Sequence, residues 1–229
     1  DVSLPEAEQS MNAQLKKYRF VSQKPVILPI ERTISGRVSV RPHKSDAVSL
    51  IVAIPTVSIY SPDRHIFKIL LNLLARDFGA SLPDKLRSQG GLIYTWVSDQ
   101  DNLFDTGYLL FKTATHKKNS MKVVHIIIEE FQRIARGEIQ DEEIEAAKSN
   151  LIGRLLTNIE TGSDYIYWYG LQEFYSLEKV LHIHDQINIY KNISRKEILS
   201  IAKRYFSIDQ IYIAACGNIE QKEIEKVLR

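Results

Sequence analysis

The stretch Arg87-Ser-Gln-Gly-Gly-Leu-Ile-Tyr94 predicts a short helix, residues 82–87, that turns sharply into a strand. Its two adjacent glycines suit a tight turn or a close backbone approach because they carry no side chain. The residues from Ile93 to Val97 are the β-branched and aromatic types that strands favour. The turn therefore has a fixed positive charge on one side and a phenol on the other. Spacing alone also fits an ordinary connection with a surface arginine and a half-buried tyrosine.

The segments before this turn predict a central strand followed by an amphipathic helix. Residues 48–54 are almost continuously apolar, as in a central strand. The pair Ser61-Pro62 predicts a helix start, because serine caps the first turn and proline lacks the N–H that has no partner there. Apolar side chains then recur every three or four residues to about Phe78. One face of this helix is therefore predicted to lie on the core.

The segments after the turn predict two strands and then mostly helices. Residues 92–98 and 107–115 have strand composition and are joined by the polar segment 99–102, so we expect antiparallel neighbours. The other expected elements are a strand at 38–41, a helix at 120–135 that Gly137 ends, a helix from Asp141, a helix opened by the capping box Ser194-Arg-Lys-Glu197, a strand at 211–216 and a helix at 221–228. We expect Cys216, in the last strand, to be buried.

These elements predict an α+β fold, with a mixed, largely antiparallel sheet and several long helices packed on one face. Between Glu142 and Phe206, four helical segments follow one another without a strand, which a doubly wound α/β fold would not show. Residues 1–35 are expected to form a lead-in helix and a linker arm, since prolines interrupt regular structure there. Residues 36–229 are expected to form a single domain.

Composition excludes several classes of protein. The chain has 229 residues, of which 44% are hydrophobic, so it can bury a sizeable core. Lys and Arg number 30 against 28 for Asp and Glu, and this balance gives no reason to expect nucleic acid or a membrane surface as a partner. The single cysteine excludes an intramolecular disulfide and a multi-cysteine metal site. With no apolar run of membrane-spanning length and no secretory signal at its start, the chain is expected to be soluble, in a compartment that the sequence leaves open.

Several motifs, taken in order, resemble the pitrilysin/insulinase family of zinc metallopeptidases, and more narrowly its second, non-catalytic half. They are Ser81-Leu-Pro-Asp-Lys-Leu-Arg87, Gly91-Leu-Ile-Tyr94, Asp105-Thr-Gly107-Tyr and Gly137-Glu-Ile-Gln-Asp-Glu-Glu-Ile-Glu-Ala-Ala-Lys148. An arginine followed by Gly-Leu-x-Tyr that ends seven residues later is the best-known pattern of that half. The resemblance extends over most of residues 38–229. Its strength lies in the order of the motifs, because any one of them alone would be weak.

The resemblance implies a chamber formed by two homologous halves. The first half carries an inverted zinc motif, His-x-x-Glu-His, on the helix after its opening strands. The matching helix here, residues 61–76, offers His65 but has Lys68 and Ile69 in place of the glutamate and the second histidine. The chain is therefore expected to bind no metal and no cofactor and to be inactive alone. Zinc is expected in a catalytic partner half.

By the same resemblance, Arg87 and Tyr94 would reach across the chamber, bind the carbonyl groups of a peptide substrate and stabilise the tetrahedral oxyanion. Arginine stays charged at any working pH, and tyrosine donates a hydrogen bond without adding charge. The implied function is the non-catalytic half of a zinc metalloendopeptidase, with its catalytic half in the same longer chain or in a separate subunit. The alternative is a structural or docking subunit of the same fold with no proteolytic role. A homodimeric binding module is a third option.

Two other clusters suggest function less strongly. The histidines of His182-Ile-His184-Asp185 would share a metal only on a strand, whereas residues 180–190 predict a helix. No Gly-x-Ser-x-Gly turn or glycine-rich phosphate loop is present. An aromatic run is interpreted as a helix that packs its broad face between the sheet and neighbouring helices, in preference to a binding platform. The run comprises Tyr165, Tyr167, Trp168, Tyr169, Phe174 and Tyr175.

Overall fold

The structure is a computed structural model that describes residues 2–18, 36–76, 79–88, 90–175, 177 and 179–229. The chain divides into two units, Asp1–Thr33 and Ile34–Arg229. The first unit contains helix α1, Leu4–Leu15, which a capping box between Ser3 and Glu6 opens and which has no buried residue. The linker predicted at about residues 20–35 lies outside the described residues.

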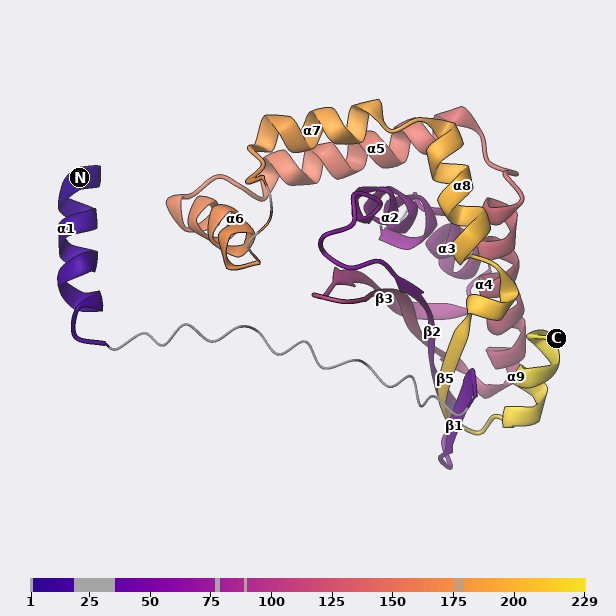
Figure 1. Ribbon diagram of the computed structural model, residues 1–229. Helices are drawn as coiled ribbons and strands as arrows, with labels where there is room; N and C mark the ends of the chain where they lie inside the picture. The colour runs from indigo at the N-terminus through magenta and orange to yellow at the C-terminus, as the bar shows by residue number, and fades with distance from the viewer. Residues whose placement is uncertain (1, 19–35, 77–78, 89, 176, 178) are drawn as a thin grey trace. The chain divides into compact units, whose positions relative to one another are not determined.

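The second unit is built on a five-stranded mixed sheet with the strand order β1-β5-β2-β4-β3 (Figure 1). Strand β1 pairs parallel with β5, and the other three pairings are antiparallel. The predicted mixed, largely antiparallel sheet is therefore confirmed. The strands are β1 Val38–Pro42, β2 Ala47–Thr56, β3 Ile93–Asn102, β4 Gly107–His116 and β5 Tyr212–Gly217.

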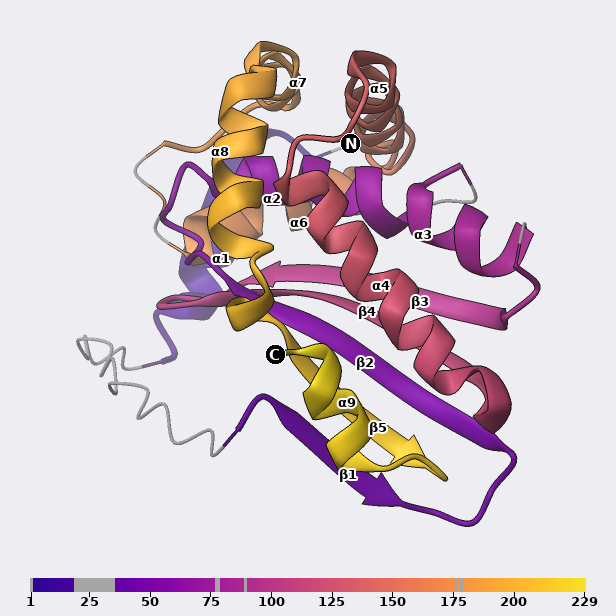
Figure 2. The same cartoon turned by 90° about the vertical axis from the view of Figure 1, so that its right-hand side faces the viewer.

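Helices cover one face of this sheet, as predicted (Figures 1 and 2). In β2, every second side chain from Val48 to Ile54 is buried, which is the period expected of a strand with one covered face. Helices α2, α4 and α8 lie next to the sheet, and α5 and α7 lie outside α2. The helical elements are α2 Arg64–Leu71, η1 Asn72–Arg76, α3 Ser81–Pro83, η2 Asp84–Ser88, η3 Lys117–Asn119, α4 Ser120–Ala135, α5 Asp141–Thr157, α6 Gly162–Phe174, α7 Ile183–Asn192, α8 Arg195–Tyr205, η4 Ile208–Gln210 and α9 Gln221–Val227.

Several predicted boundaries are confirmed. Helix α4 has the predicted limits, and Gly137 takes the positive φ of 77° that lets the chain leave a helix. The capping box between Ser194 and Glu197 opens α8. Between α5 and α8 the described residues contain helices and no strand. The core beneath these helices includes the fully buried rings of Phe67 and Phe111.

The predicted polar loop at residues 99–102 is wrong, because these residues continue β3. Asp99 lies opposite Leu110 and Asn102 lies opposite Gly107 in the ladder with β4. The Asn102 side chain donates to the carbonyl of Val57 at 2.7 Å. Cross-strand hydrogen bonds thus outweigh the turn propensity of these polar residues. The connection between the strands is four residues further on.

Two further expectations are corrected. Helix α2 begins at Arg64, since Ser61 Oγ accepts a hydrogen bond from Asp63 N in a turn that precedes the helix. Cys216 is exposed, because it alternates with the buried Ala215 along β5 and so faces away from the helices. The prediction from the sequence assigned this cysteine to the correct strand but to the wrong face of the sheet.

Candidate functional site

Arg87 lies on a short segment whose backbone is held by buried contacts. The segment, η2, follows α3 and turns with π-helical hydrogen bonding. Its Leu86 side chain is fully buried, and the Leu86 carbonyl accepts a hydrogen bond from Leu92 N at 2.7 Å. Lys85 forms an ion pair with the buried Glu130 of α4. The Arg87 side chain is exposed. The well-packed segment η2 therefore presents a cation to solvent.

The glycine turn after Arg87 has the geometry that its sequence predicts. Gly91 has a φ of +56°, a left-handed conformation that side chains disfavour. At Gly90, an added Cβ would lie 2.6 Å from the carbonyl oxygen of Lys85. Both positions therefore require glycine, one for conformation and the other for space. The predicted tight turn is confirmed.

Tyr94 lies where the edge strand β3 is irregular. Ile93 pairs with Thr115 and Trp96 with Thr113, so three residue steps in β3 span two in β4. Trp96 faces the helices, since its Nε1 donates to Ala75 O at 2.9 Å. Tyr94, within the irregularity, is 85% exposed, not half-buried.

The structure brings Arg87 and Tyr94 to the same edge of the second unit. The guanidinium carbon of Arg87 lies 5.8 Å from the ring centroid of Trp96, two residues beyond Tyr94 on β3. Neither side chain is sealed inside the domain. The arrangement presents a cation and a phenol to solvent from the turn between η2 and β3, which we call the corner. Their joint action on a substrate stays a prediction.

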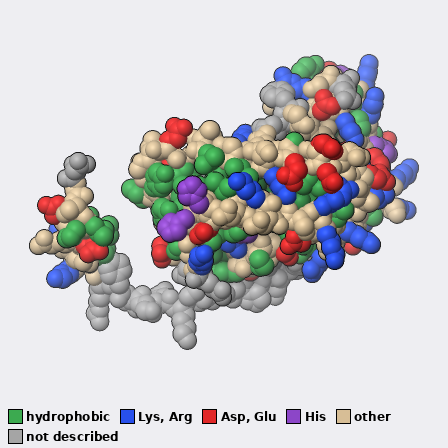
Figure 3. Space-filling model, turned by 90° about the horizontal axis from the view of Figure 1, so that it is seen from above, with side chains coloured by type: hydrophobic (Ala, Val, Ile, Leu, Met, Phe, Trp, Pro, Cys, Tyr) green, Lys and Arg blue, Asp and Glu red, His purple; other side chains and the backbone are tan. Residues whose placement is uncertain are grey.

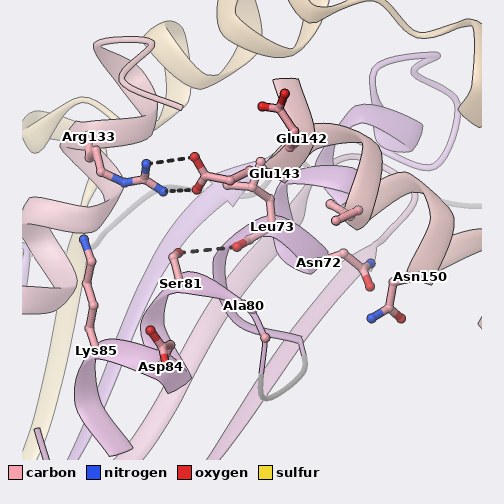
Figure 4. A pocket seen from close by; sticks show the side chains of 13 residues that line it. Asn72, Leu73, Ala80, Ser81, Asp84, Lys85, Arg133, Glu142, Glu143 and Asn150 are labelled. Atoms are coloured by element: carbon pink, nitrogen blue, oxygen red, sulfur yellow. Dashed lines mark hydrogen bonds and ion pairs between the residues drawn. The ribbon is translucent and has the colours of Figure 1, made fainter. Parts of the chain in front are cut away.

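A buried ion network supports this corner. Glu130 is fully buried and accepts from Lys85 of η2 and from Arg133 Nε at 2.8 Å. Arg133 also contacts Glu143 of α5 at 2.7 Å, and this carboxylate raises the pKa of Arg133 while the arginine lowers the pKa of Glu143. Figure 4 shows Lys85, Arg133 and Glu143 along one side of a pocket of about 570 Å³. The charges satisfy one another, so we interpret the network as structural.

The helix that matches the zinc helix of the family has no residues suited to zinc. His65 is buried, its Nδ1 lies 2.9 Å from Gln186 Nε2, and its ring packs edge-on against Tyr190. Burial, and to a smaller extent the cations of Arg64 and Lys68, lower the pKa of His65 to about 3. His65 is therefore a neutral core histidine. Within the described residues, no group of three or more His, Cys, Asp or Glu side chains is placed to hold a metal ion.

The two histidines near α7 lie in different settings. His182 precedes α7 as its N-cap residue, and its Nδ1 lies 3.0 Å from the Tyr169 hydroxyl. His184 is one residue into the helix. The predicted helix at residues 180–190 begins at Ile183, which agrees with our preference against a strand-borne metal pair.

The interpretation of the aromatic run as a packed helix is wrong. Helix α6 has no buried residue, and Tyr165, Tyr167 and Phe174 are 42%, 70% and 71% exposed. Figure 1 shows α6 beyond the end of α5, away from the sheet, and Figure 3 shows apolar side chains gathered at that end of the unit. Aromatic residues at consecutive positions point to different sides of a helix, so only a few of them can face a neighbour.

One cluster was missed by sequence reasoning. Lys68 of α2, Arg76 of η1 and Arg154 of α5 line a common hollow of about 260 Å³ beside Trp168 of α6. Lys68 and Arg76 lie on consecutive helical segments, but nothing in the sequence joins them to Arg154. The hollow exists only because α5 packs on α2.

Comparison with known proteins identifies the family of this chain. Residues 1–151 match the family described as "Peptidase M16 inactive domain". The chain belongs to this family. The match confirms the resemblance to the non-catalytic half of pitrilysin-type peptidases. It also agrees with the replacement of the inverted zinc motif by Lys68 and Ile69 on the helix that contains His65.

The chain matches only part of the length of each of its relatives. It is 31% identical over 157 residues to the "Non-peptidase homolog YmxG" of Helicobacter pylori (strain ATCC 700392 / 26695), a match over 66% of this chain and 35% of that protein. It is also similar to the structure of a protease from H. pylori, with a TM-score of 0.80 and 15% identity over 94% of this chain and 53% of that chain.

A third relative is a chain in the structure of "Complex III2 from Candida albicans, Inz-5 bound". Its TM-score is 0.70 at 11% identity, over 83% of this chain and 48% of that chain. At these identities the structural likenesses show the fold alone. The chain spans about a third of the curated relative and about half of the two solved chains. Among the described residues, none of the helices combines the length and the apolar character that a membrane crossing requires.

Proposed function

We propose that this chain is the non-catalytic half of a pitrilysin-type zinc metalloendopeptidase. In this role it closes the peptide chamber and supplies Arg87 and Tyr94 to bind the substrate. The observation that carries the proposal is the exposed pair on the rigid corner between η2 and β3. Buried contacts hold the backbone beneath Arg87, and the side chains of Arg87 and Tyr94 are both exposed.

The chemistry of the pair supports the proposal. A guanidinium offers several N–H donors and a phenol offers one O–H donor, so both can donate to a carbonyl oxygen as negative charge develops on it. The ion pair between Lys85 and Glu130 and the buried Leu86 fix the backbone under Arg87. Donors that are fixed in advance need little rearrangement when the substrate reacts. Binding of peptide carbonyls is thus the activity that the corner supports best.

The catalytic chemistry would come from a partner half, in the same polypeptide or in a separate subunit. The solved relatives are about twice as long as the matched part of this chain, which leaves room for such a half. The zinc expected there would activate the attacking water. On its own, this chain is expected to be inactive on peptides.

A structural or docking role is the second candidate. It is favoured by the name of the H. pylori relative, a non-peptidase homolog, and by the similarity to a chain in a complex III structure. In that case the partner half would also lack His-x-x-Glu-His. Arg87 and Tyr94 would then have no role in catalysis.

Peptide cleavage by the assembled protein distinguishes the two roles. In the assembly with its catalytic half, Arg87→Ala and Tyr94→Phe are each expected to lower kcat/KM by about 10²–10³-fold, as the loss of one oxyanion donor does. The matched controls Arg41→Ala and Tyr212→Phe, on the opposite part of the sheet, should leave cleavage unchanged. Unaltered rates in the Arg87 and Tyr94 variants would refute their assigned role. An assembly that cleaves no peptide would favour the docking role.

A further inference from the structure

The outer side of α6 carries an apolar stripe that faces solvent. The stripe consists of Tyr167, Gly170, Leu171 and Phe174, which lie on one side of the helix because they are three or four residues apart. Ile166, one turn before Gly170, widens the stripe. Tyr167, Phe174 and Ile166 are 70%, 71% and 75% exposed.

The other side of α6 attaches the helix to its own unit. Trp168 Nε1 and Gln172 Nε2 both donate to Leu181 O, at 2.9 and 3.1 Å. The Tyr169 hydroxyl lies 3.0 Å from His182 Nδ1. A helix that is apolar on all sides is normally covered on all of them. In α6 only the attached side is covered by residues that the structure describes.

The apolar surface continues from α6 onto two other segments. The Phe174 ring lies 5.5 Å from the ring of Tyr175, which lies 5.1 Å from the ring of Phe104 in the β3–β4 turn. Tyr60 lies 6.3 Å from Phe104, and its hydroxyl donates to Tyr175 O at 3.0 Å. Phe104 and Tyr60 are both exposed. Contiguous apolar surface of this kind marks a site of interaction.

Gly170 at the centre of the stripe is not required by the fold of this chain. A Cβ added there would meet no described atom within 4 Å. Glycine also weakens the interior of a helix. Its missing side chain leaves a gap between Ile166, Tyr167 and Phe174, through which the backbone of a second helix can approach closely. Apolar anchors three and four residues apart are also the pattern by which helices pack on one another.

We propose that the outer side of α6 docks an amphipathic helix of the partner half, with lysines or arginines along the edges of its apolar side. Helix α6 contains Asp164 and Glu173 and no basic residue, so such edges complement it, whereas a second copy of α6 would add like charges. Lys179, the next basic residue along the chain, pairs with Asp185 at 3.5 Å. The solved relatives are about twice as long as the matched part of this chain, which leaves room for the docked helix. The inference rests on the partner half proposed above, but it requires neither zinc nor Arg87.

The test is equilibrium binding of fluorescein-labelled helical peptides of about 18 residues to the full chain, measured by fluorescence anisotropy. The first peptide has leucines on one side and lysines along the edges. The second has glutamates in place of the lysines, and the third has the composition of the first in scrambled order. The protein variants are Gly170→Gln and Ile166→Gln. Sedimentation of the chain alone reports whether it pairs with itself.

Gly153 of α5 provides the matched control. It is also an exposed helical glycine at which an added Cβ would meet no described atom within 4 Å, but its neighbours on the helix are the polar Ser149, Asn150 and Thr157. Glutamine is a better helix former than glycine, so neither Gly170→Gln nor Gly153→Gln should lower the stability of the chain. Urea denaturation checks this.

The lysine-edged peptide is expected to bind at least about tenfold more tightly than the other two peptides. Gly170→Gln and Ile166→Gln should each weaken its binding by about tenfold or more, because they fill the gap or remove an apolar contact. Gly153→Gln and Arg87→Ala should bind like the unaltered chain, which separates this result from the cleavage test.

Three outcomes would overturn the proposal. The first is equal binding of the three peptides, and the second is a Gly170→Gln variant that binds like Gly153→Gln. The third is a dimer of the chain alone that Gly170→Gln dissociates, because the surface would then belong to a second copy.

Discussion

Helices α2 and α6 are both rich in apolar residues, yet one is buried and the other is exposed. Leu70 in α2 is fully buried, while Ile166 in α6 is 75% exposed. In α2 the polar Arg64 and Lys68 lie four positions apart on one side, which leaves a broad apolar face that the sheet and the neighbouring helices cover. In α6 the apolar residues occupy neighbouring positions and point to several sides. The contrast teaches that the separation of polar and apolar residues onto different sides, more than the number of apolar residues, decides which helix joins the core.

The largest expected effect tests this contrast directly. Leu70→Ala should lower the free energy of unfolding by about 4 kcal/mol, because it removes buried methyl groups and leaves a cavity. Ile166→Ala in α6 should change it by no more than about 0.5 kcal/mol. Urea denaturation followed by circular dichroism measures both values. Similar losses in the two variants would mean that α6 is packed after all.

The second prediction extends the contrast to charged groups under the covered helices. Glu130→Gln should cost about 3 kcal/mol of stability, because it breaks a buried network and leaves Lys85 and Arg133 with a neutral partner. The neighbouring Glu129, which pairs with Arg136 at the surface, provides the matched control, and Glu129→Gln should have little effect. Equal effects in denaturation experiments would show that the network does not support the corner beneath Arg87.

The third prediction compares a buried histidine in α2 with an exposed one next to α6. Since the pKa of His65 is about 3 in the folded chain and ordinarily near 6.5 in an unfolded one, the unfolded state takes up a proton first as the pH falls. The contribution of His65 to stability is therefore complete above pH 6.5 and declines toward pH 3, by up to about 1.4 kcal/mol per unit. His65→Gln should remove this slope and His182→Gln should keep it. Denaturation midpoints at pH 7, 6 and 5 measure the slope, and an unchanged slope in His65→Gln would contradict the prediction.

The smallest expected effect concerns the attachment of α6. Trp168→Phe removes the hydrogen bond from the indole to Leu181 O and should cost about 1 kcal/mol. Tyr167→Phe, at a 70% exposed position of the same helix, should cost nothing measurable. Hydrogen exchange of the α6 amides reports the local change. Faster exchange in both variants would mean that the exposed aromatic side also holds the helix in place.

The sequence predicted the covered elements well. The limits of α4, the capping box of α8 and the tight turn at Gly90 and Gly91 follow from local chemistry, namely periodicity, capping and the steric freedom of glycine. Of the candidate site, the sequence identified Arg87 and Tyr94 and the helix–turn–strand that carries them. It did not reveal the irregular pairing of β3 around Tyr94, because strand register depends on the partner strand.

Other features were beyond the sequence because they depend on contacts between distant segments. The strand extension at residues 99–102 required β4 as a partner. The exposure of Cys216 depended on which face of β5 the helices cover, and a shift of one residue reverses that face. The hollow lined by Lys68 and Arg154 joins residues 86 positions apart.

By itself, the sequence determined most of the helices and strands, because capping, periodicity and glycine conformation act over a few neighbouring residues. The order of its motifs carried the resemblance to the family, and that resemblance pointed to the two residues of the proposed substrate site. The tertiary structure alone decided which faces are covered, that α6 stays exposed and that three cations meet in one hollow. These outcomes depend on how much apolar surface each element buries against the others. Burial is a property of the assembled layers, so it is settled only when the helices meet the sheet.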